Sequence, residues 1–555
     1  MRPTTLLLLW IWFCSLAPVW AAQVVETDVC VFGANAAGVV AAVQARRMGR
    51  TVALVDPGTH LGGLTTGGLG ATDIGNKAAV GGVSREFYQR VARHYARAES
   101  WTRERRADYF AHHASGQSQA SDLAATNATM WTFEPHVARD ILAGMLAEAG
   151  VEVRFAQRPA RVESEGGRIQ SLVMEGGEVF RARVFIDASY EGDLMALAGV
   201  RFIIGREANA TYRETLNGVR GSTPSHQFLV PVDPYRREGD PSSGLLPGIQ
   251  PGSGGQPGAG DTLVQTYNYR LCFTKDPDNR RPVEPPPGYD PARYELLARY
   301  LEALVKAGRK TTLAAFWNPI WMPNHKTDIN NNGPFSTDDI GMNQAYPAAD
   351  QAAREGIARE HENYTRGLLV FLATDPRVPQ AMRNEMRSWG PCKDEFESTG
   401  GWPPQLYIRE ARRMVSDYVM TEHHCRGAEV AADAVALAAY NMDSHNCQRI
   451  VKHGRVENEG DVQVPPMKPY PISYRAIVPR AGEASNLLVP VCLSASHIAY
   501  GSIRMEPVFM ALGQSAATAA VLALDEGGEV RRVDYARLRA RLLADGQALA
   551  WPPTR

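Results

Sequence analysis

The sequence predicts an α/β protein in which a parallel sheet with helices forms the main domain and an α+β domain is inserted into it. Two stretches, residues 28–46 and 184–199, each run from an apolar strand through a tight turn into a helix of small residues. Between residues 212 and 348 the composition changes, and Pro and Gly crowd residues 240–260 and 277–289. A chain of 555 residues is also too long for one simple core, so two domains are expected.

The first residues predict a secretory signal peptide. Arg2 precedes a short apolar core at residues 6–13, and Val19 and Ala21 fit a cleavage site after residue 21. The core is too short to span a bilayer, and no later window runs to about 18 apolar residues. We therefore expect a periplasmic or secreted protein that has no membrane partner after cleavage. A buried N-terminal helix is the alternative.

Composition excludes some classes of partner. The net charge of −1 gives no reason to expect nucleic acid. Six cysteines follow the signal segment, too few over this length for a disulfide framework, and Cys425 with Cys447 is the first pair to test. There is no Cys-x-x-Cys or His-Glu-x-x-His pattern, so no zinc site is expected.

Residues 28–46 predict a site for a dinucleotide. A helix N-terminus that follows a strand and a glycine turn points its free N–H groups at phosphates. Asn35 stands where a second glycine is usual, and Asn is the side chain that best tolerates a left-handed backbone. The second strand ends about 20 residues beyond the turn, in a carboxylate that can accept from a ribose hydroxyl. The residues expected at the cofactor are Gly33, Asn35, Ala37, Gly38 and Asp56. An ordinary strand-turn-helix without a ligand is the alternative.

The glycine-rich stretch 57–70 and the second strand-turn-helix extend this site. Gly62, Gly63 and Leu64 lie where backbone can approach a flat ring closely. Helices are expected at 83–98 and 134–150, followed by short strands with glycine turns. From the strands and the second turn we expect further contacts from Ala160, Ala188, Ser189 and Asp193.

The inserted domain is predicted to contain helices at residues 292–307, 349–372 and 378–388. Its most polar stretch, Asp328 to Asp339, nearly matches a calcium loop but ends in Asp where Glu is usual. A polar turn that lines a cleft is the other interpretation, and we expect no bound metal.

The last third of the chain is expected to complete the main domain. An apolar strand at 486–491 leads through a polar loop into a helix begun by Pro507, which aims a second helix N-terminus at the cofactor. Glu506, Gly513 and Gln514 are the contacts expected there. The predicted boundaries are 1–21 for the signal peptide, 22–211 and 401–555 for the main domain, and 212–400 for the insert.

Four spaced segments together resemble the secreted branch of the FAD-dependent oxidoreductase family, whose Rossmann-like flavin domain is similar to that of glutathione reductase and fumarate reductase. They are the Gly33 turn with Leu61-Gly-Gly63, Ile186-Asp-Ala-Ser189 with Gly192-Asp193, Tyr407-Ile-Arg-Glu-Ala-Arg-Arg413, and Ser494-Ala-Ser-His497 with Gly501-Ser-Ile-Arg504 and Gly513-Gln514. The resemblance covers nearly the whole mature chain. It implies FAD as the cofactor and an inserted cap.

A flavin enzyme also needs a group that moves a proton and positive charge near the flavin. His497 and His445 lie in polar loops, and histidine is the side-chain type whose ordinary pKa is nearest to neutral pH, so either is a candidate base, with a structural role as the alternative. Arg409 and Arg413 are expected on one face of a helix, and Arg504 lies at the second helix start. These considerations give His497, His445, Arg504 and Arg409 as the catalytic candidates. His60 is a candidate for covalent attachment of the flavin.

Two functions of different class follow. The first is a secreted FAD-dependent oxidoreductase that oxidises a polar small molecule, with a carbohydrate-derived one as the candidate, and passes electrons to an acceptor that the sequence does not identify. The alternative is a non-catalytic binding module that keeps the FAD fold and binds a polysaccharide or another extracellular ligand. A hydrolase is disfavoured because the chain has no Gly-x-Ser-x-Gly elbow.

Overall fold

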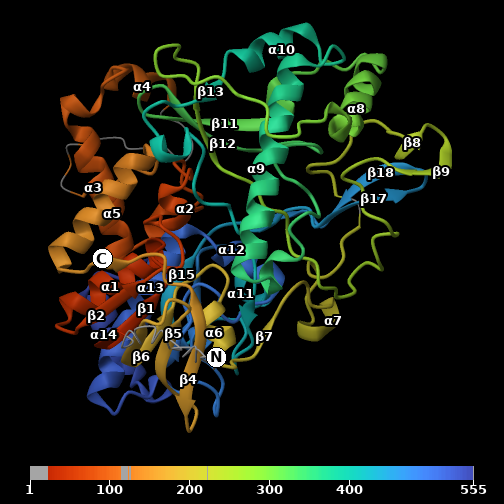
Figure 1. Cartoon of the computed structure of the whole chain (residues 1–555). Helices are drawn as coiled ribbons and strands as arrows, with labels where there is room; N and C mark the ends of the chain where they lie inside the picture. Colours follow the sequence, from red (N-terminus) through yellow and green to blue (C-terminus); the bar gives the residue numbers. More distant parts are fainter. Residues whose placement is uncertain (1–22, 114–122, 124, 126, 222, 554–555) are drawn as a thin grey trace, which may run out of the picture.

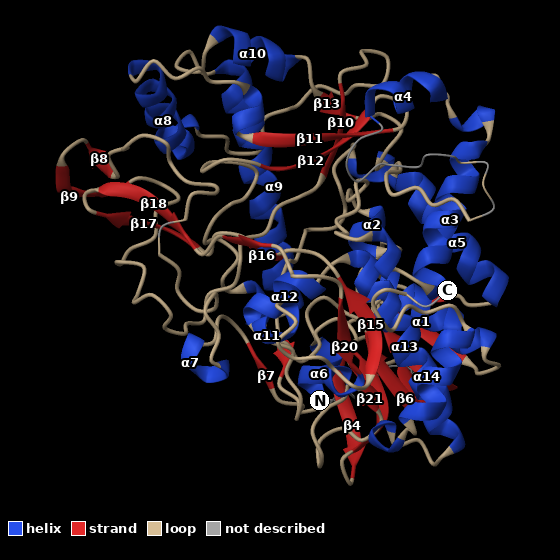
Figure 2. Cartoon of the chain, turned by 180° about the vertical axis from the view of Figure 1, so that it is seen from behind, coloured by secondary structure: helices blue, strands red, loops and turns tan. Residues whose placement is uncertain are grey.

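The computed structural model describes residues 23–113, 123, 125, 127–221 and 223–553 (Figures 1 and 2). The predicted signal peptide lies outside the described residues. Helices α1, α3, α5 and α13 gather around the main sheet, and the strands β10–β13 form a second sheet beyond it (Figure 1). The long helix α9 runs from the region of α10 toward the main domain (Figures 1 and 2).

The main sheet has seven strands in the order β3-β2-β1-β6-β5-β4, with β21 also paired to β6. Strands β3, β2, β1, β6 and β21 are parallel, and β4 and β5 add an antiparallel meander. The bounds are β1 (Val24–Phe32), β2 (Val52–Val55), β3 (Val153–Arg154), β4 (Pro159–Glu165), β5 (Arg168–Met174), β6 (Val179–Asp187) and β21 (Leu487–Leu488). Residues 29–32 of β1 and 184–186 of β6 are apolar and fully buried, as expected where helices cover both faces of a parallel sheet.

The helices of the main domain confirm the expected order of strand, turn and helix. They are α1 (Ala36–Arg47), α2 (Gly63–Thr66), α3 (Gly82–Ala96), α4 (Arg106–His113), α5 (Pro135–Ala149), α6 (Asp193–Leu197), α12 (His497–Ile503), α13 (Glu506–Asp525) and α14 (Tyr535–Ala544). Helix α13 crosses α1 so closely that a Cβ on Gly513 would lie 2.3 Å from the carbonyl oxygen of Ala37. Glycine is therefore required at this crossing, and the two helices form the centre of the core.

Helix α13 is unusually long and apolar. Among the described residues, α13 is long and apolar enough to span a membrane by length and composition, and 94% of its most apolar window is buried inside the protein. Its apolar side chains pack against the neighbouring helices and strands of the main domain. The composition of α13 is therefore that of a core helix.

The region between residues 271 and 391 forms a four-stranded sheet in the order β11-β12-β10-β13. Its strands are β10 (Leu271–Thr274), β11 (Trp317–Met322), β12 (Lys326–Asn331) and β13 (Gly390–Pro391), and its helices are α8 (Glu295–Lys306), α9 (Gln351–Thr374) and α10 (Gln380–Arg387). All three helices lie where the sequence predicts them. The amphipathic α8 buries Leu297, Leu301 and Leu304 on one face, and Asp350 caps α9 by accepting from the backbone N–H of Ala353.

Small antiparallel pairs complete the chain. They are β7 (Phe202–Ile203) with β14 (Arg413–Met414), β8 (Tyr235–Arg237) with β9 (Asp240–Leu245), β15 (Ala434–Ala438) with β20 (Tyr470–Ser473), β16 (Met442–Ser444) with β19 (Val462–Val464), and β17 (Gln448–Lys452) with β18 (Arg455–Glu459); α7 (Asn209–Tyr212) and α11 (Glu422–Cys425) are short helices. The helix expected around Arg409 is wrong. That segment is extended because Tyr407 bridges Asn268 and Arg413 pairs with Ile203 across two strands.

Residues 328–339 do not form a calcium loop, and the candidate pair Cys425 and Cys447 is not joined. Asp328 lies within strand β12 and binds Arg270, whereas Asp339 binds Arg293, so the two ends of the predicted loop are held by different arginines. Cys425, which lies in α11, and Cys447, which directly precedes β17, are both buried free thiols.

Candidate active site

The turn after β1 depends on two glycines that touch each other. Gly33 has φ +103°, and a Cβ on it would lie 2.8 Å from the backbone nitrogen of Ser189. A Cβ on Gly38 would lie 1.8 Å from the carbonyl oxygen of Gly33. These contacts bring the first turn of α1 directly against the end of β6, so the two strand-turn-helix units meet at one edge of the sheet.

Asn35 replaces the usual glycine by capping the helix. Its backbone is extended at φ −68°, so the expected left-handed conformation is wrong. The side-chain oxygen accepts from the backbone N–H of Gly38 at 3.0 Å, and the side-chain nitrogen donates to the carbonyl oxygen of Ala188. Asn35 therefore ties the helix N-terminus to the second turn.

Asp56 closes the same edge. One carboxylate oxygen accepts from the backbone N–H of Ala34 at 2.6 Å, and the other accepts from Gly58 at 2.7 Å. Burial raises the pKa of Asp56, and these two hydrogen bonds oppose the rise. Each oxygen keeps a second lone pair with which it can accept from a ribose hydroxyl.

A cavity of about 360 Å³ opens at this edge, between the main domain and α9. Five of the residues predicted to bind the cofactor line it, namely Gly33, Asn35, Asp56, Gly63 and Ser189. A Cβ on Gly63 would lie 2.5 Å from the hydroxyl of Tyr190, so the cavity wall requires glycine there. Glycine backbone, a helix N-terminus and a carboxylate suit a dinucleotide, and these residues would hold the nucleotide part of FAD.

Some predicted cofactor residues have other partners. Gly513 and Ala37 form the crossing of α13 and α1, and the Gln514 side chain accepts from the backbone N–H of Val83. Ala160 is exposed on β4, and Asp193 binds two arginines. None of these five residues lines the cavity within the described chain.

Glu506 joins the start of α13 to the glycine-rich stretch. Its carboxylate accepts from the hydroxyls of Thr65 at 2.6 Å and Tyr190 at 2.8 Å, and the Tyr190 hydroxyl accepts from the backbone N–H of Leu64 at 3.0 Å. Burial raises the pKa of Glu506 to about 7, although both hydroxyls oppose the rise. Glu506 and Leu64 are thus linked through the hydroxyl of Tyr190, although 442 positions separate them along the chain.

His60 lies between two cavities, one of about 360 Å³ and one of about 590 Å³. Its Nε2 is 2.7 Å from the hydroxyl of Thr66. Burial, with a contribution from Arg139, lowers the pKa of His60 to about 4, so the ring is neutral at physiological pH. Covalent attachment of the flavin to this residue stays a prediction.

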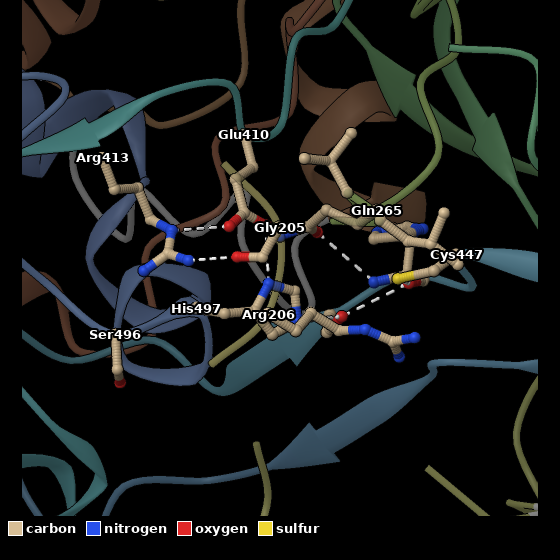
Figure 3. Close-up of polar contacts among 12 residues, drawn as sticks. Gly205, Arg206, Gln265, Glu410, Arg413, Cys447, Ser496 and His497 are labelled. Carbon is tan, nitrogen blue, oxygen red and sulfur yellow. Dashed lines mark hydrogen bonds and ion pairs between the residues drawn. The ribbon is translucent and has the colours of Figure 1, made fainter. Parts of the chain in front are cut away.

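The second part of the site is a buried network around His497 (Figure 3). The His497 ring and the Arg413 guanidinium converge on Glu410, with His497 Nδ1 at 2.7 Å and Arg413 Nε at 2.7 Å from its two oxygens. His497 Nε2 is 3.0 Å from the hydroxyl of Ser444. Burial would raise the pKa of Glu410, but His497 and Arg413 lower it to about 2. Both ring nitrogens of His497 are therefore engaged.

His445 is held differently. Its Nδ1 is 3.0 Å from an oxygen of Asp338, whose other oxygen lies 3.0 Å from Arg409. Its Nε2 is 3.7 Å from Asp443, beyond hydrogen-bond distance. Burial raises the pKa of Asp338, but Arg409 and His445 outweigh it and hold that pKa below its usual range. The Nε2 atom is the less constrained of the two ring nitrogens.

Arg504 and Tyr407 close the network on the other side. Arg504 donates to Asp443 at 3.2 Å and to the hydroxyl of Tyr407 at 2.6 Å, and the guanidinium carbon of Arg409 lies 4.7 Å from the Tyr407 ring centroid. Several buried polar atoms here have no hydrogen-bond partner within the described chain, namely Arg409 Nε, Arg504 Nε, Asp443 Oδ1, Asn343 Oδ1 and Asn446 Nδ2. These atoms can donate to or accept from polar groups that enter the network.

The structure thus brings His445, Arg409 and Arg504 into one network, with His497 joined to it through Ser444, the residue before His445. Sequence reasoning missed Asp338, Glu410, Asp443 and Arg354. Asp443 precedes His445 by two positions at the end of a strand, so the alternation of side chains could have placed both on one face. Asp338 and Glu410 carry no such local signal.

No curated protein matches the chain. One similar solved structure is a flavin monooxygenase from Stenotrophomonas maltophilia, with 18% sequence identity and a TM-score of 0.18; the match covers 29% of this chain and 37% of that one. Another is 3-ketosteroid-delta4-(5alpha)-dehydrogenase from Rhodococcus jostii RHA1, with 16% identity and a TM-score of 0.20; the match covers 33% of this chain and 50% of that one. A third is Sdh1 from Mycobacterium smegmatis, with 15% identity and a TM-score of 0.21; the match covers 34% of this chain and 42% of that one. The chain spans half or less of the length of these proteins. The sequence from residue 28 to 542 matches the model of the FAD dependent oxidoreductase family. The chain is therefore a member of the FAD-dependent oxidoreductase family and uses FAD as its cofactor.

Proposed function

We propose that this flavoenzyme oxidises an uncharged, hydroxyl-rich small molecule, such as a carbohydrate derivative, and that it works outside the cytoplasm. The observation that carries the substrate class is the buried network of Arg409, Asp338, His445, Asp443 and Arg504, which leaves both donors and acceptors without partners. The proposal that the protein is exported rests on the signal-like N-terminus of the sequence.

The charges of this network favour a neutral substrate. Two guanidinium groups face two carboxylates, so their charges cancel at neutral pH. A substrate carboxylate in this buried network would need a positive charge that is not already paired. Among the described residues the network offers none, and burying an unpaired charge is costly. A hydroxyl both donates and accepts, so adjacent hydroxyls match the free Nε–H groups of Arg409 and Arg504 and the free oxygen of Asp443.

His445 is the residue best placed to move the proton. Asp338 accepts from Nδ1–H, which fixes the tautomer with a lone pair on Nε2. Nε2 can then take the proton of a substrate hydroxyl while Arg409 keeps Asp338 ionised. His497 is less suited because Glu410 and Ser444 occupy both of its ring nitrogens. FAD, when bound, supplies the hydride acceptor.

The test is anaerobic reduction of the bound flavin, followed by its absorbance. The full chain loaded with FAD is mixed with neutral sugars and polyols, and separately with hydroxy acids and dicarboxylates. We expect reduction by one or more of the neutral compounds. Reduction by the acids alone would contradict the neutral substrate class, and no reduction by any compound would favour the binding module instead.

Export is tested separately. We expect the N-terminus of protein recovered from the periplasm or the medium to begin at Ala22, after removal of residues 1–21. Retention of the whole protein in the cytoplasm with Met1 still present would overturn this part of the proposal. The outcome leaves the substrate assignment unaffected, because that assignment rests on the buried network.

A further inference from the structure

We propose that Cys272 and Cys392 form a disulfide bond when the chain folds in the presence of a disulfide-containing oxidant. The two residues lie on neighbouring strands of the second sheet, Cys272 in β10 and Cys392 directly after β13. Both are fully buried, and their sulfur atoms are 3.8 Å apart. Within the described chain, no other contact between two cysteine sulfurs is this short.

The register of the strands places the two residues opposite each other. Phe273 pairs with Pro391 and Thr274 with Gly390, and Cys392 continues the ladder by donating its N–H to the carbonyl oxygen of Cys272 at 3.1 Å. Opposite residues of an antiparallel pair have Cα atoms about 4.5–5.5 Å apart, which lies within the range that a disulfide spans. Rotation of the side chains can therefore close the bond without moving the backbone.

The bond would brace one wall of the cavity of about 590 Å³. Asp394 and Glu395 follow Cys392 and line this cavity with His136. Both carboxylates hold the ammonium group of Lys326 on strand β12, at 2.9 Å and 2.8 Å. A link between Cys392 and β10 would fix the start of this segment to the sheet that carries Lys326.

The chemistry is an exchange of thiols and disulfides. The two cysteine thiols lose two protons and two electrons as the new sulfur–sulfur bond forms, and the disulfide of the oxidant is reduced to two thiols. The attacking species is a thiolate, and burial raises the pKa of the Cys272 thiol well above its usual range. The bond therefore forms before the sheet encloses the sulfurs, and it is then shielded from reductants.

The experiment is peptide mapping of the full chain, folded with oxidised and reduced glutathione. The protein is alkylated under denaturing conditions without reductant and digested. We expect a linked pair of peptides that contain Cys272 and Cys392, which separates on reduction. Alkylation of both cysteines, or a link from either one to a different cysteine, would overturn the proposal.

Thermal unfolding provides a second readout. We expect the melting temperature of the oxidised protein to lie a few degrees above that of the reduced protein. Cys272→Ala should abolish this difference, whereas the control variant Cys425→Ala should retain it. An equal difference in both variants would contradict the assignment, and if Cys272→Ala fails to fold, the peptide map of the unmutated chain decides.

Discussion

Arg354 of helix α9 holds Asp193 of helix α6 through two hydrogen bonds, at 2.6 Å and 2.9 Å. Arg412 donates to the same carboxylate at 2.7 Å. Burial opposes ionisation, but the two arginines hold the pKa of Asp193 below its usual range. Because Arg354 also lines the cavity beside Gly33, this ion pair fastens the inserted region to the main domain next to the nucleotide site.

Replacing Arg354 tests that attachment. Arg354→Met should lower the free energy of unfolding by about 1–3 kcal/mol, because it leaves the half-buried carboxylate of Asp193 with one of its two cationic partners. FAD should also dissociate more readily, since the cavity wall loses its anchor. Denaturant unfolding and the fluorescence of released flavin measure the two effects.

The control for Arg354 is Arg359→Met, on the exposed side of the same helix. It should change the free energy of unfolding by less than about 0.5 kcal/mol. Equal effects of the two variants would show that the contact between Arg354 and Asp193 does not join the domains.

His445→Gln should slow reduction of the flavin by substrate by about 10²–10⁴-fold, because Gln cannot take the hydroxyl proton. The amount of bound FAD should stay unchanged. His497→Gln should chiefly lower the melting temperature, since it removes the hydrogen bond between His497 and the buried carboxylate of Glu410. Stopped-flow absorbance and thermal unfolding separate the two variants, and the reverse pattern would assign the base to His497.

Glu506 should make stability depend on pH. Its pKa of about 7 in the folded protein exceeds the value of about 4.3 for an unfolded chain. As pH rises from 4 to 8 the unfolded chain ionises first, so the folded state loses up to about 3 kcal/mol. Glu506→Gln does not titrate, so the melting temperature of the variant should rise relative to that of the unmutated protein between pH 4 and pH 8. A constant difference across this range would contradict the burial of an ionisable group here.

Gly513→Ala should destabilise the protein by about 1–3 kcal/mol, because its Cβ meets the backbone oxygen of Ala37 and forces α1 and α13 apart. The matched control is Gly144→Ala in helix α5, where a Cβ would have no atom within 4 Å. That change should stabilise the helix by about 0.5–1 kcal/mol. Chemical denaturation checks both, and opposite signs are the expected result.

Local patterns predicted the fold well where a segment contains its own signal. The apolar run that ends at Gly33 and the amphipathic pattern of residues 292–307 led to the observed strand, turn and helix. The prediction failed at Arg409, where the spacing of Arg409 and Arg413 suggested that both side chains lie on one face of a helix. Pairing of Tyr407 with Asn268 and of Arg413 with Ile203 keeps that segment extended, and those partners are distant in sequence.

The class of fold and the cofactor could be predicted from the amino-acid sequence, because short motifs encode the turn that binds a nucleotide. Residue type and local position also singled out His445, His497, Arg409 and Arg504, but their partners depend on the packing of the whole chain. His445 meets Asp338 across 107 positions, and His497 meets Glu410 across 87. Such contacts depend on how whole elements pack, and no local spacing specifies them. The physical reason is that hydrogen bonds and ion pairs act over a few ångströms in space, whatever the separation along the chain.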